Sequence, residues 1–185
     1  HSDDDETSRR KAIQEQIDRI DNIIQYQLRR AATAGSSPGM GMIALRPLAD
    51  RIVNTVAKAY RNKQPEISVQ INDSIGLRID EGDLMELLGN LVDNAFKWCR
   101  QRIQLSAAYH HHQVVIQVID DGPGIQPDQI ARILERGVRA DQSTPGHGIG
   151  LAIVRDIVQV YGGELAIENH PDGGACITLR LKKAK

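Results

Sequence analysis

The chain has 185 residues, of which 41% are hydrophobic and 25% charged, as in an ordinary soluble globular domain with an additional element. The formal net charge of −1 gives no general affinity for polyanions, so nucleic acid is not expected as a partner. No apolar run approaches the roughly 18 residues that cross a bilayer, and no signal peptide is visible. The first residue is His1, so we interpret the chain as a fragment whose absent segments provide any contact with a membrane.

The first predicted element is one amphipathic helix over residues 8–33. Its isoleucines are spaced by four, three and four residues, which favours the seam of a helical bundle, although a helix packed on its own domain is an alternative. The Gly-, Ser- and Pro-rich segment 35–41 is the predicted hinge. We therefore divide the chain into a helical part, 1–34, a hinge and a domain over 42–185.

Within that domain, apolar periodicity predicts helices and strands in a mixed order. Helices are expected near 48–60, 84–95 and 148–161, and strands near 67–71, 103–109, 114–119, 165–167 and 175–181. Consecutive strands with few helical crossovers predict an α/β protein with a helical layer on one face of a mixed, largely antiparallel sheet. Cys99 and Cys176 lack metal-site spacing and are expected to be reduced thiols of a cytosolic domain.

Polar residues lie on one face of the predicted helix 84–95. Asn90 and Asn94 are four residues apart and therefore share a face, which Lys97 extends. Amide oxygens suit Mg²⁺, and a lysine can meet a phosphate as a point charge. For a single asparagine, a solvated helix position is the plainer explanation.

Two glycine turns follow. Asp120 ends a predicted strand and precedes Gly122 and Gly124, so its carboxylate can accept a hydrogen bond from the exocyclic amine of a base, although Asp-Gly-Pro-Gly also forms ordinary turns. Glycines alternate over 146–150 at the start of the last predicted helix, where backbone N–H groups bind phosphate. The polar stretch 135–145 between them is either a lid over a nucleotide or a plain surface loop.

These segments, in this order, resemble the ATP-binding domain of the GHKL superfamily, which includes gyrase-type topoisomerases, heat-shock chaperone ATPases, histidine kinases and MutL proteins. Residues 90–97 resemble its N box, 120–124 its G1 box and 146–151 its G2 box. The resemblance covers about 42–185. It implies the Bergerat ATP-binding fold, with ATP and Mg²⁺ as ligands.

The histidine-kinase branch fits best. The ATPase branches carry a glutamate at the position of Asn90, and an amide cannot act as a general base. Residues 1–34 resemble the second helix of a dimerisation and phosphoacceptor hairpin. The PhoQ-type sensor kinases have similar amino-acid sequences at the segments 16–20, 26–31 and 93–99 of this chain.

The resemblance also implies roles for single residues. Asn90 and Asn94 are expected to contact Mg²⁺ and phosphate, Lys97 phosphate, Trp98 the base or ribose, and Asp120 the adenine amine. The residues expected to bind nucleotide are Asn94, Lys97, Trp98, Asp120, Gly122, Gly124, Ile125, Arg136, Gly146, His147, Gly148, Ile149, Gly150 and Leu151.

The chain departs from the family pattern at three positions. Leu134 stands where many kinases carry a phenylalanine, and Thr144 stands where a basic residue is common, so that one phosphate contact is missing or moved to Arg139. His147 replaces a more usual amide, which is expected to make ATP affinity sensitive to pH.

No histidine in the chain carries the phosphoacceptor pattern. The triplet 110–112 lies between two predicted strands, where adjacent residues cannot all face one metal ion. We expect the kinase to form a homodimer through its dimerisation helices and to phosphorylate a histidine on an absent helix. Relay to a response-regulator aspartate would follow, on the cytoplasmic side of a bacterial inner membrane.

Two other functions remain open from sequence. One is a GHKL-type ATPase, with Asp93 as a possible base, and Asn90 in place of glutamate argues against it. The other is a non-catalytic dimerisation module with a decayed site, which the intact set Asn94, Lys97 and Asp120 argues against.

Overall fold

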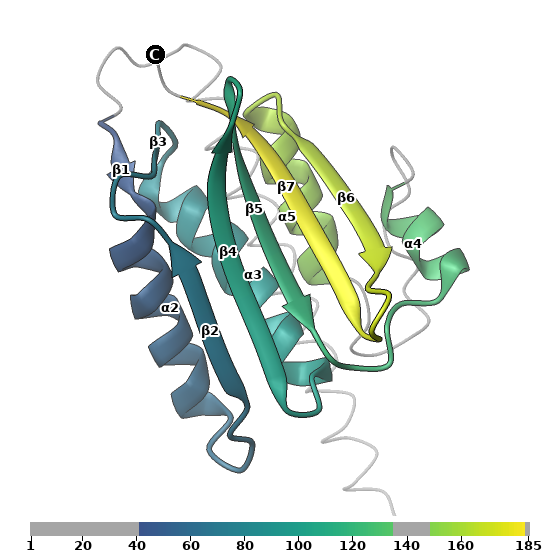
Figure 1. Ribbon diagram of the computed structural model, residues 1–185. Helices are drawn as coiled ribbons and strands as arrows, with labels where there is room; N and C mark the ends of the chain where they lie inside the picture. The colour runs from purple at the N-terminus through teal and green to yellow at the C-terminus, as the bar shows by residue number, and fades with distance from the viewer. Residues whose placement is uncertain (1–40, 135–148, 184–185) are drawn as a thin grey trace, which may run out of the picture. The chain divides into compact units, whose positions relative to one another are not determined.

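A five-stranded sheet organises the domain in the computed structural model, which describes residues 41–134 and 149–183. The strand order is β2-β4-β5-β7-β6 (Figure 1). Strand β2 pairs with β4 in parallel, and the other three pairs are antiparallel. The strands span Glu66–Ile71 (β2), Arg102–His110 (β4), Gln113–Asp120 (β5), Glu164–Asn169 (β6) and Ala175–Lys182 (β7).

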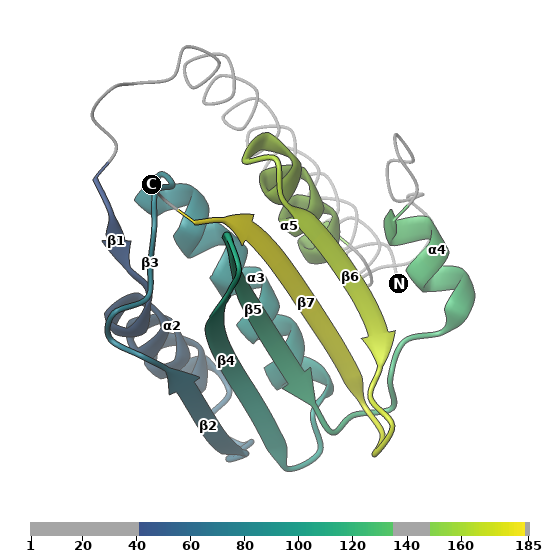
Figure 2. The same cartoon turned by 45° about the horizontal axis from the view of Figure 1, so that its top comes forward.

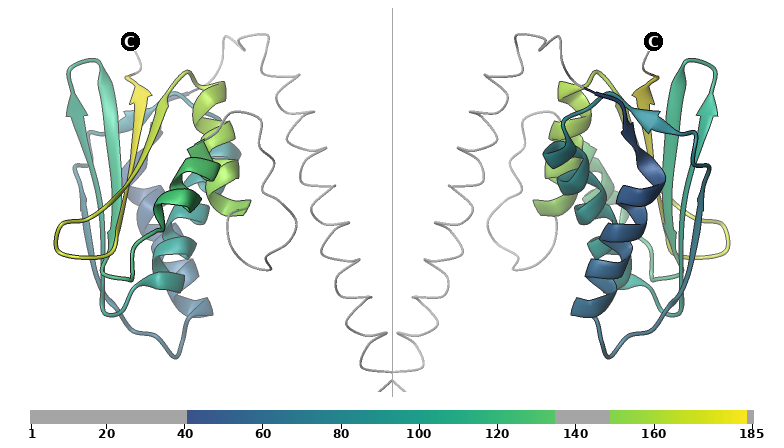
Figure 3. Two further views of the ribbon diagram at one scale, coloured as in Figure 1. Left: turned by 90° about the vertical axis from the view of Figure 1, so that its right-hand side faces the viewer. Right: turned by 90° about the vertical axis from the view of Figure 1, so that its left-hand side faces the viewer.

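The long helices cover one face of this sheet and leave the other open (Figure 3). They are α2 (Leu45–Ala59), α3 (Glu81–Trp98) and α5 (Ile149–Val160). The predicted fold, a helical layer on a mixed, largely antiparallel sheet, is therefore confirmed. None of the helices in the described part of the chain is both long and apolar enough to span a membrane.

The central helix α3 packs between α2 and α5 and faces β5 (Figure 2). Its N-cap Asp80 accepts a hydrogen bond from the backbone N–H of Asp83 at 3.1 Å. Its apolar side is fully buried at Leu84, Leu87, Leu88, Leu91 and Phe96. Alternate residues of β5 point into the same core, namely Val114, Ile116 and Val118. Each such side chain contributes ~1.5–3 kcal/mol on burial.

Two features were not predicted. Helix α4 (Pro127–Leu134) lies beside β6, and a two-stranded sheet joins β1 (Ile43–Ala44) to β3 (Gly76–Leu77). The helix predicted over 8–33, the hinge up to residue 40 and the lid over 135–145 lie outside the described residues.

The thiols and the histidine triplet fall where the sequence places them. Cys99, just after α3, and Cys176, in β7, are both free cysteines. His110 ends β4, and His111 takes a left-handed φ of 52° in the β4–β5 turn.

Candidate nucleotide-binding site

Asn90 presents its amide oxygen to the first turn of α5. Its Nδ2 donates to the backbone oxygen of Glu86 at 2.7 Å, which fixes the orientation of the side chain. A Cβ on Gly150 would lie 2.8 Å from Asn90 Oδ1, so only glycine allows this approach. Two of the predicted site segments are thereby brought together.

Asn94 and Lys97 continue this side of α3 toward its C-terminus. Asn94 is partly exposed, and its amide has no hydrogen-bond partner among the residues that the structure describes. The exposed Lys97 places Nζ 5.4 Å from the centroid of the Trp98 ring, within cation–π range. The amide of Asn94 is therefore available to a ligand beside a cation and an aromatic ring.

Asp120 is a buried carboxylate, and only one of its two oxygens accepts hydrogen bonds from the described residues. The residue is 4% exposed, and Oδ1 accepts hydrogen bonds from the backbone N–H of Gly122 at 2.8 Å and of Ala175 at 3.4 Å. Burial raises the pKa of this carboxyl above its ordinary value, although the two hydrogen bonds act in the opposite direction. Oδ2 accepts no hydrogen bond from the described residues, as the prediction of a base-reading group requires.

The turn after Asp120 packs against the end of α3. A Cβ on Gly122 would overlap the carbonyl oxygen of Trp98, so glycine is needed for the close approach. Gly124 has a φ of 79°, and a Cβ there would lie 2.6 Å from Asn169 Oδ1. The predicted Asp120 turn and the predicted Lys97–Trp98 pair are therefore neighbours in space.

Sequence reasoning missed three residues that hold this arrangement. Asn169 clasps Ile125, accepting from its N–H at 2.8 Å and donating to its carbonyl oxygen at 3.0 Å. Gly174, with a φ of 89°, leaves room for the Asp120 carbonyl, which a Cβ would overlap. Lys63 Nζ donates to the carbonyl oxygens of Phe96 at 2.8 Å and Lys97 at 2.9 Å, which caps α3. Only the glycine had a local signal, as a turn former.

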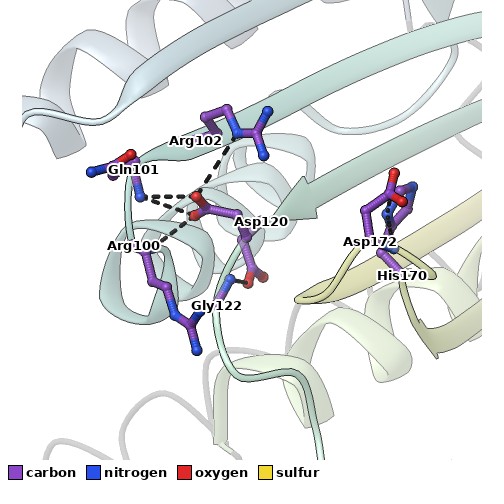
Figure 4. A network of polar contacts seen from close by, with 8 residues as sticks. Arg100, Gln101, Arg102, Asp120, Gly122, His170 and Asp172 are labelled. Atoms are coloured by element: carbon purple, nitrogen blue, oxygen red, sulfur yellow. Dashed lines mark hydrogen bonds and ion pairs between the residues drawn. The ribbon is translucent and has the colours of Figure 1, made fainter.

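The next residue, Asp121, has a structural role. It accepts from the backbone N–H groups of Arg100 at 2.8 Å and Gln101 at 3.0 Å, and lies 3.9 Å from Arg102 Nε. Burial alone would raise the pKa of this carboxyl, but the backbone hydrogen bonds outweigh it and lower the pKa. Figure 4 shows Arg100, Gln101 and Arg102 on one side of the Asp120 turn, with His170 and Asp172 apart on the other.

Asp93 is directed toward a different helix. Tyr60, which follows α2, donates its hydroxyl to Asp93 Oδ1 at 3.0 Å. Burial and this hydrogen bond raise the pKa of Tyr60 to about 12. Asp93 therefore contacts α2, whereas Asn90 contacts α5.

A groove of about 320 Å³ lies on the open face of the sheet. Asp120, Arg102 and Asp172 are among its lining residues. The residues Asn90, Asn94 and Lys97 are not. The groove therefore shares Asp120 with the predicted nucleotide site but does not include the polar face of α3.

The described part of the chain leaves some predicted residues untested. Ile149 begins α5, and Leu151 is buried at 6% exposed. Leu134 ends α4. The residues that lie outside the described ranges are Arg136, Arg139, Thr144, Gly146, His147 and Gly148.

The sequence over residues 79–185 matches the family described as histidine kinase-, DNA gyrase B- and HSP90-like ATPase. The chain belongs to this family. It is 38% identical over 171 residues to the two-component sensor PhoQ of Pseudomonas aeruginosa. The aligned residues make up 92% of this chain and 38% of PhoQ. The chain thus spans about two fifths of this relative, and the resemblance to PhoQ-type sensors is confirmed.

Solved structures agree with this family. The mycobacterial sensor histidine kinase MprB superposes with a TM-score of 0.64 at 25% identity, over 78% of this chain and 97% of that one. Full-length ShkA, solved in complex with AMPPNP, superposes with a TM-score of 0.66 at 25% identity, over 94% of this chain and 38% of ShkA. The chain therefore carries the ATP-binding catalytic domain of a sensor kinase, as the sequence predicts.

Proposed function

We propose that this chain binds Mg·ATP and donates its γ-phosphoryl group to a histidine that lies outside this sequence. The histidine nitrogen would form a bond to the γ-phosphorus while the bond to the β,γ-bridging oxygen breaks and ADP leaves. The phosphoryl group would then pass to an aspartate of a response regulator. Homodimerisation through helices that include residues 1–34 would present the histidine, on the cytoplasmic side of a membrane.

One observation carries this proposal: an amide, and not a carboxylate, faces the first turn of α5. Asn90 Oδ1 points toward Gly150, which is where family members that hydrolyse ATP would need a base. An amide can hold a cation or a phosphate-bound water but cannot accept a proton from water. The site is therefore suited to holding ATP for an incoming nucleophile.

The other side chains supply recognition. Asp120 Oδ2 would accept a hydrogen bond from the adenine amine, and Lys97 and the first turn of α5 would contact the phosphates. Trp98 would lie along the base or ribose. The complex of ShkA with AMPPNP supports a nucleotide at this kind of site.

Mg²⁺ would rest on amide oxygens and phosphates. The described residues contain no group of three or more His, Cys, Asp or Glu side chains that could hold a metal ion. Asn90 and Asn94 offer two neutral oxygens on one helix face, which fits a cation that takes most of its shell from water and substrate phosphates. Bound there, the ion would neutralise charge on the transferring phosphoryl group.

ATP hydrolysis is the second candidate, and the position of Asp93 disfavours it. That carboxylate is held by Tyr60 on the α2 side of α3, while Asn90 faces α5. A decayed scaffold is disfavoured by the available amide of Asn94 and the uncommitted oxygen of Asp120.

The test is a calorimetric titration of Mg·ATP into the chain and two matched variants. Asp120→Asn should weaken binding ~10-fold or more, because a hydrogen bond to a charged acceptor contributes ~1.5–3 kcal/mol. Asp172→Asn removes the same charge from a side chain that is 88% exposed and should bind as wild type does. A wild-type chain that binds no ATP, or equal binding by all three, would refute the proposed site.

A further inference from the structure

A tyrosine joins the far end of α5 to the first turn of α3. Tyr161, the residue after α5, donates its hydroxyl to Asp83 Oδ2 at 2.6 Å and accepts from the backbone N–H of Asp80 at 3.2 Å. These partners precede it by 78 and 81 residues. The phenol thus links the C-terminal end of α5 to the first turn of α3.

The pair of Tyr161 and Asp83 stabilises the fold less than apolar side chains of the same size would. Asp83 is 6% exposed, and its Oδ1 is buried without a hydrogen-bond partner among the described residues. Burying an unsatisfied carboxylate oxygen opposes folding, because the oxygen loses its hydrogen bonds to water. Phenylalanine opposite leucine would fill the same volume without that penalty. A requirement for defined geometry explains the pair better than a requirement for stability.

The geometry concerns the position of α5 along α3. Tyr161 is fixed to the start of α3, while Gly150, at the other end of α5, lies against Asn90. A helix is rigid, with a rise of about 1.5 Å per residue, so that an anchor at one end determines where the other end lies. Sliding α5 by about one residue rise would move its first N–H groups out of place relative to Asn90.

We propose that Tyr161 is a positioning residue for phosphate binding: through Asp83 and Asp80 it sets the register of α5 against α3 and so holds the first turn of α5 opposite Asn90. This inference rests on the proposed function, in which that turn contacts the phosphates. Asp120, which would bind the adenine amine, is the last residue of β5, so its position does not depend on the register of α5 against α3.

The test compares ATP with adenosine in the whole chain carrying Tyr161→Phe. We expect affinity for Mg·ATP to fall ~10-fold, because the first turn of α5 is no longer held in register for the phosphates, while affinity for adenosine stays within ~2-fold. The chain has one tryptophan, Trp98, whose fluorescence can report both titrations. Tyr109→Phe is the matched control, since Tyr109 donates to Ser74 O at 3.1 Å and accepts from Gly76 N–H at 3.3 Å, away from α5. It should leave both affinities unchanged.

A second pair of variants covers the case in which Tyr161→Phe does not fold. Asp83→Leu should reproduce the selective loss of ATP affinity. Asp83→Asn keeps an acceptor for the phenol, so its ATP affinity should stay close to that of the wild-type chain. Unchanged ATP binding in Tyr161→Phe, or equal losses for ATP and adenosine, would refute the positioning role while the proposed function stands. A wild-type chain that binds adenosine no more weakly than ATP would refute the phosphate site itself.

Discussion

Asp120 and Asp121 are adjacent in sequence, yet their surroundings move their pKa values in opposite directions. Desolvation dominates at Asp120, which has two backbone donors on one oxygen, and its pKa rises. Several backbone donors converge on Asp121, and its pKa falls. The carboxylate of Asp121 fixes the loop between α3 and β4, whereas Oδ2 of Asp120 accepts no hydrogen bond from the described residues.

Replacement of Asp120 by asparagine should separate stability from binding. A raised folded-state pKa means that Asp120 favours folding at low pH and that this contribution is lost as pH rises through the raised value. Asp120→Asn removes that dependence, so we expect its Tm relative to wild type to increase from pH 3.5 to 7, while ATP affinity falls. Thermal unfolding of both chains across this pH range measures the difference in Tm. A Tm of the variant that falls relative to wild type as pH rises would contradict the desolvation argument.

The cap formed by Lys63 gives a second prediction at this scale. Its ammonium satisfies two carbonyls at the end of the helix that carries Lys97 and Trp98. Lys63→Met should lower the free energy of unfolding by about 1–3 kcal/mol, because hydrogen bonds from a charged donor are lost and the carbonyls stay partly buried. Lys58→Met, at an exposed lysine near the end of α2, is the control and should change it by less than about 0.5 kcal/mol. Urea denaturation distinguishes them; equal effects would argue against the cap.

The sequence shows the types of the site residues but not their long-range partners. Asn90 and Asn94 share a helix face by spacing alone, and Asp120 follows a strand that alternation predicts. Lys63 and Asn169 reach partners at least 33 residues away, and no periodicity encodes such contacts. Chain topology brings these residues together, so only the folded arrangement identifies them.

At the scale of elements, the long helices and the strands of the five-stranded sheet follow from their periodicity, and the short α4 does not. Its 8 residues begin with Pro127, a favoured first helical residue, after Gln126, whose carbonyl accepts from the N–H of Ile130 at 3.0 Å. So short a segment shows about two turns of apolar spacing, and Asp-Gly-Pro-Gly over 121–124, shortly before it, favours a loop. The strands β1 and β3 have 2 residues each, too few for any alternation.

Two glycines provide a test of the contact between α3 and α5. Gly150→Ala adds a methyl group 2.8 Å from Asn90 Oδ1, which must move although Glu86 holds it. We expect ~10-fold weaker ATP binding, despite the gain of about 1 kcal/mol in helix propensity. Gly89→Ala has no atom within 4 Å of the new methyl group and should stabilise α3 with unchanged affinity. Calorimetry with both variants measures their ATP affinities. A Gly150→Ala chain that binds ATP as well as wild type would contradict a role for Asn90 in ATP binding.

At the scale of the whole chain, the predicted domain start at residue 42 can be tested by truncation. The buried apolar residues in the described part of the chain lie between Leu45 and Leu181. Leu45 is fully buried, and its backbone N–H donates to Ile75 O at 2.9 Å. A chain over 42–185 should therefore keep its ATP affinity within ~2-fold and unfold cooperatively.

Six further residues, 42–47, decide where the boundary lies. A chain over 48–185 loses strand β1, the Leu45 side chain and Arg46, whose guanidinium reaches the carbonyl oxygen of Ile71 on the edge strand β2 at 3.3 Å. Removing a buried leucine alone lowers stability by about 2–5 kcal/mol, so this shorter chain should unfold at much lower urea. Parallel urea titrations of the two truncated chains measure the difference. If both are equally stable, the domain begins later than β1; if both fail to fold, residues 1–41 contribute to the core, and the division at the hinge is wrong.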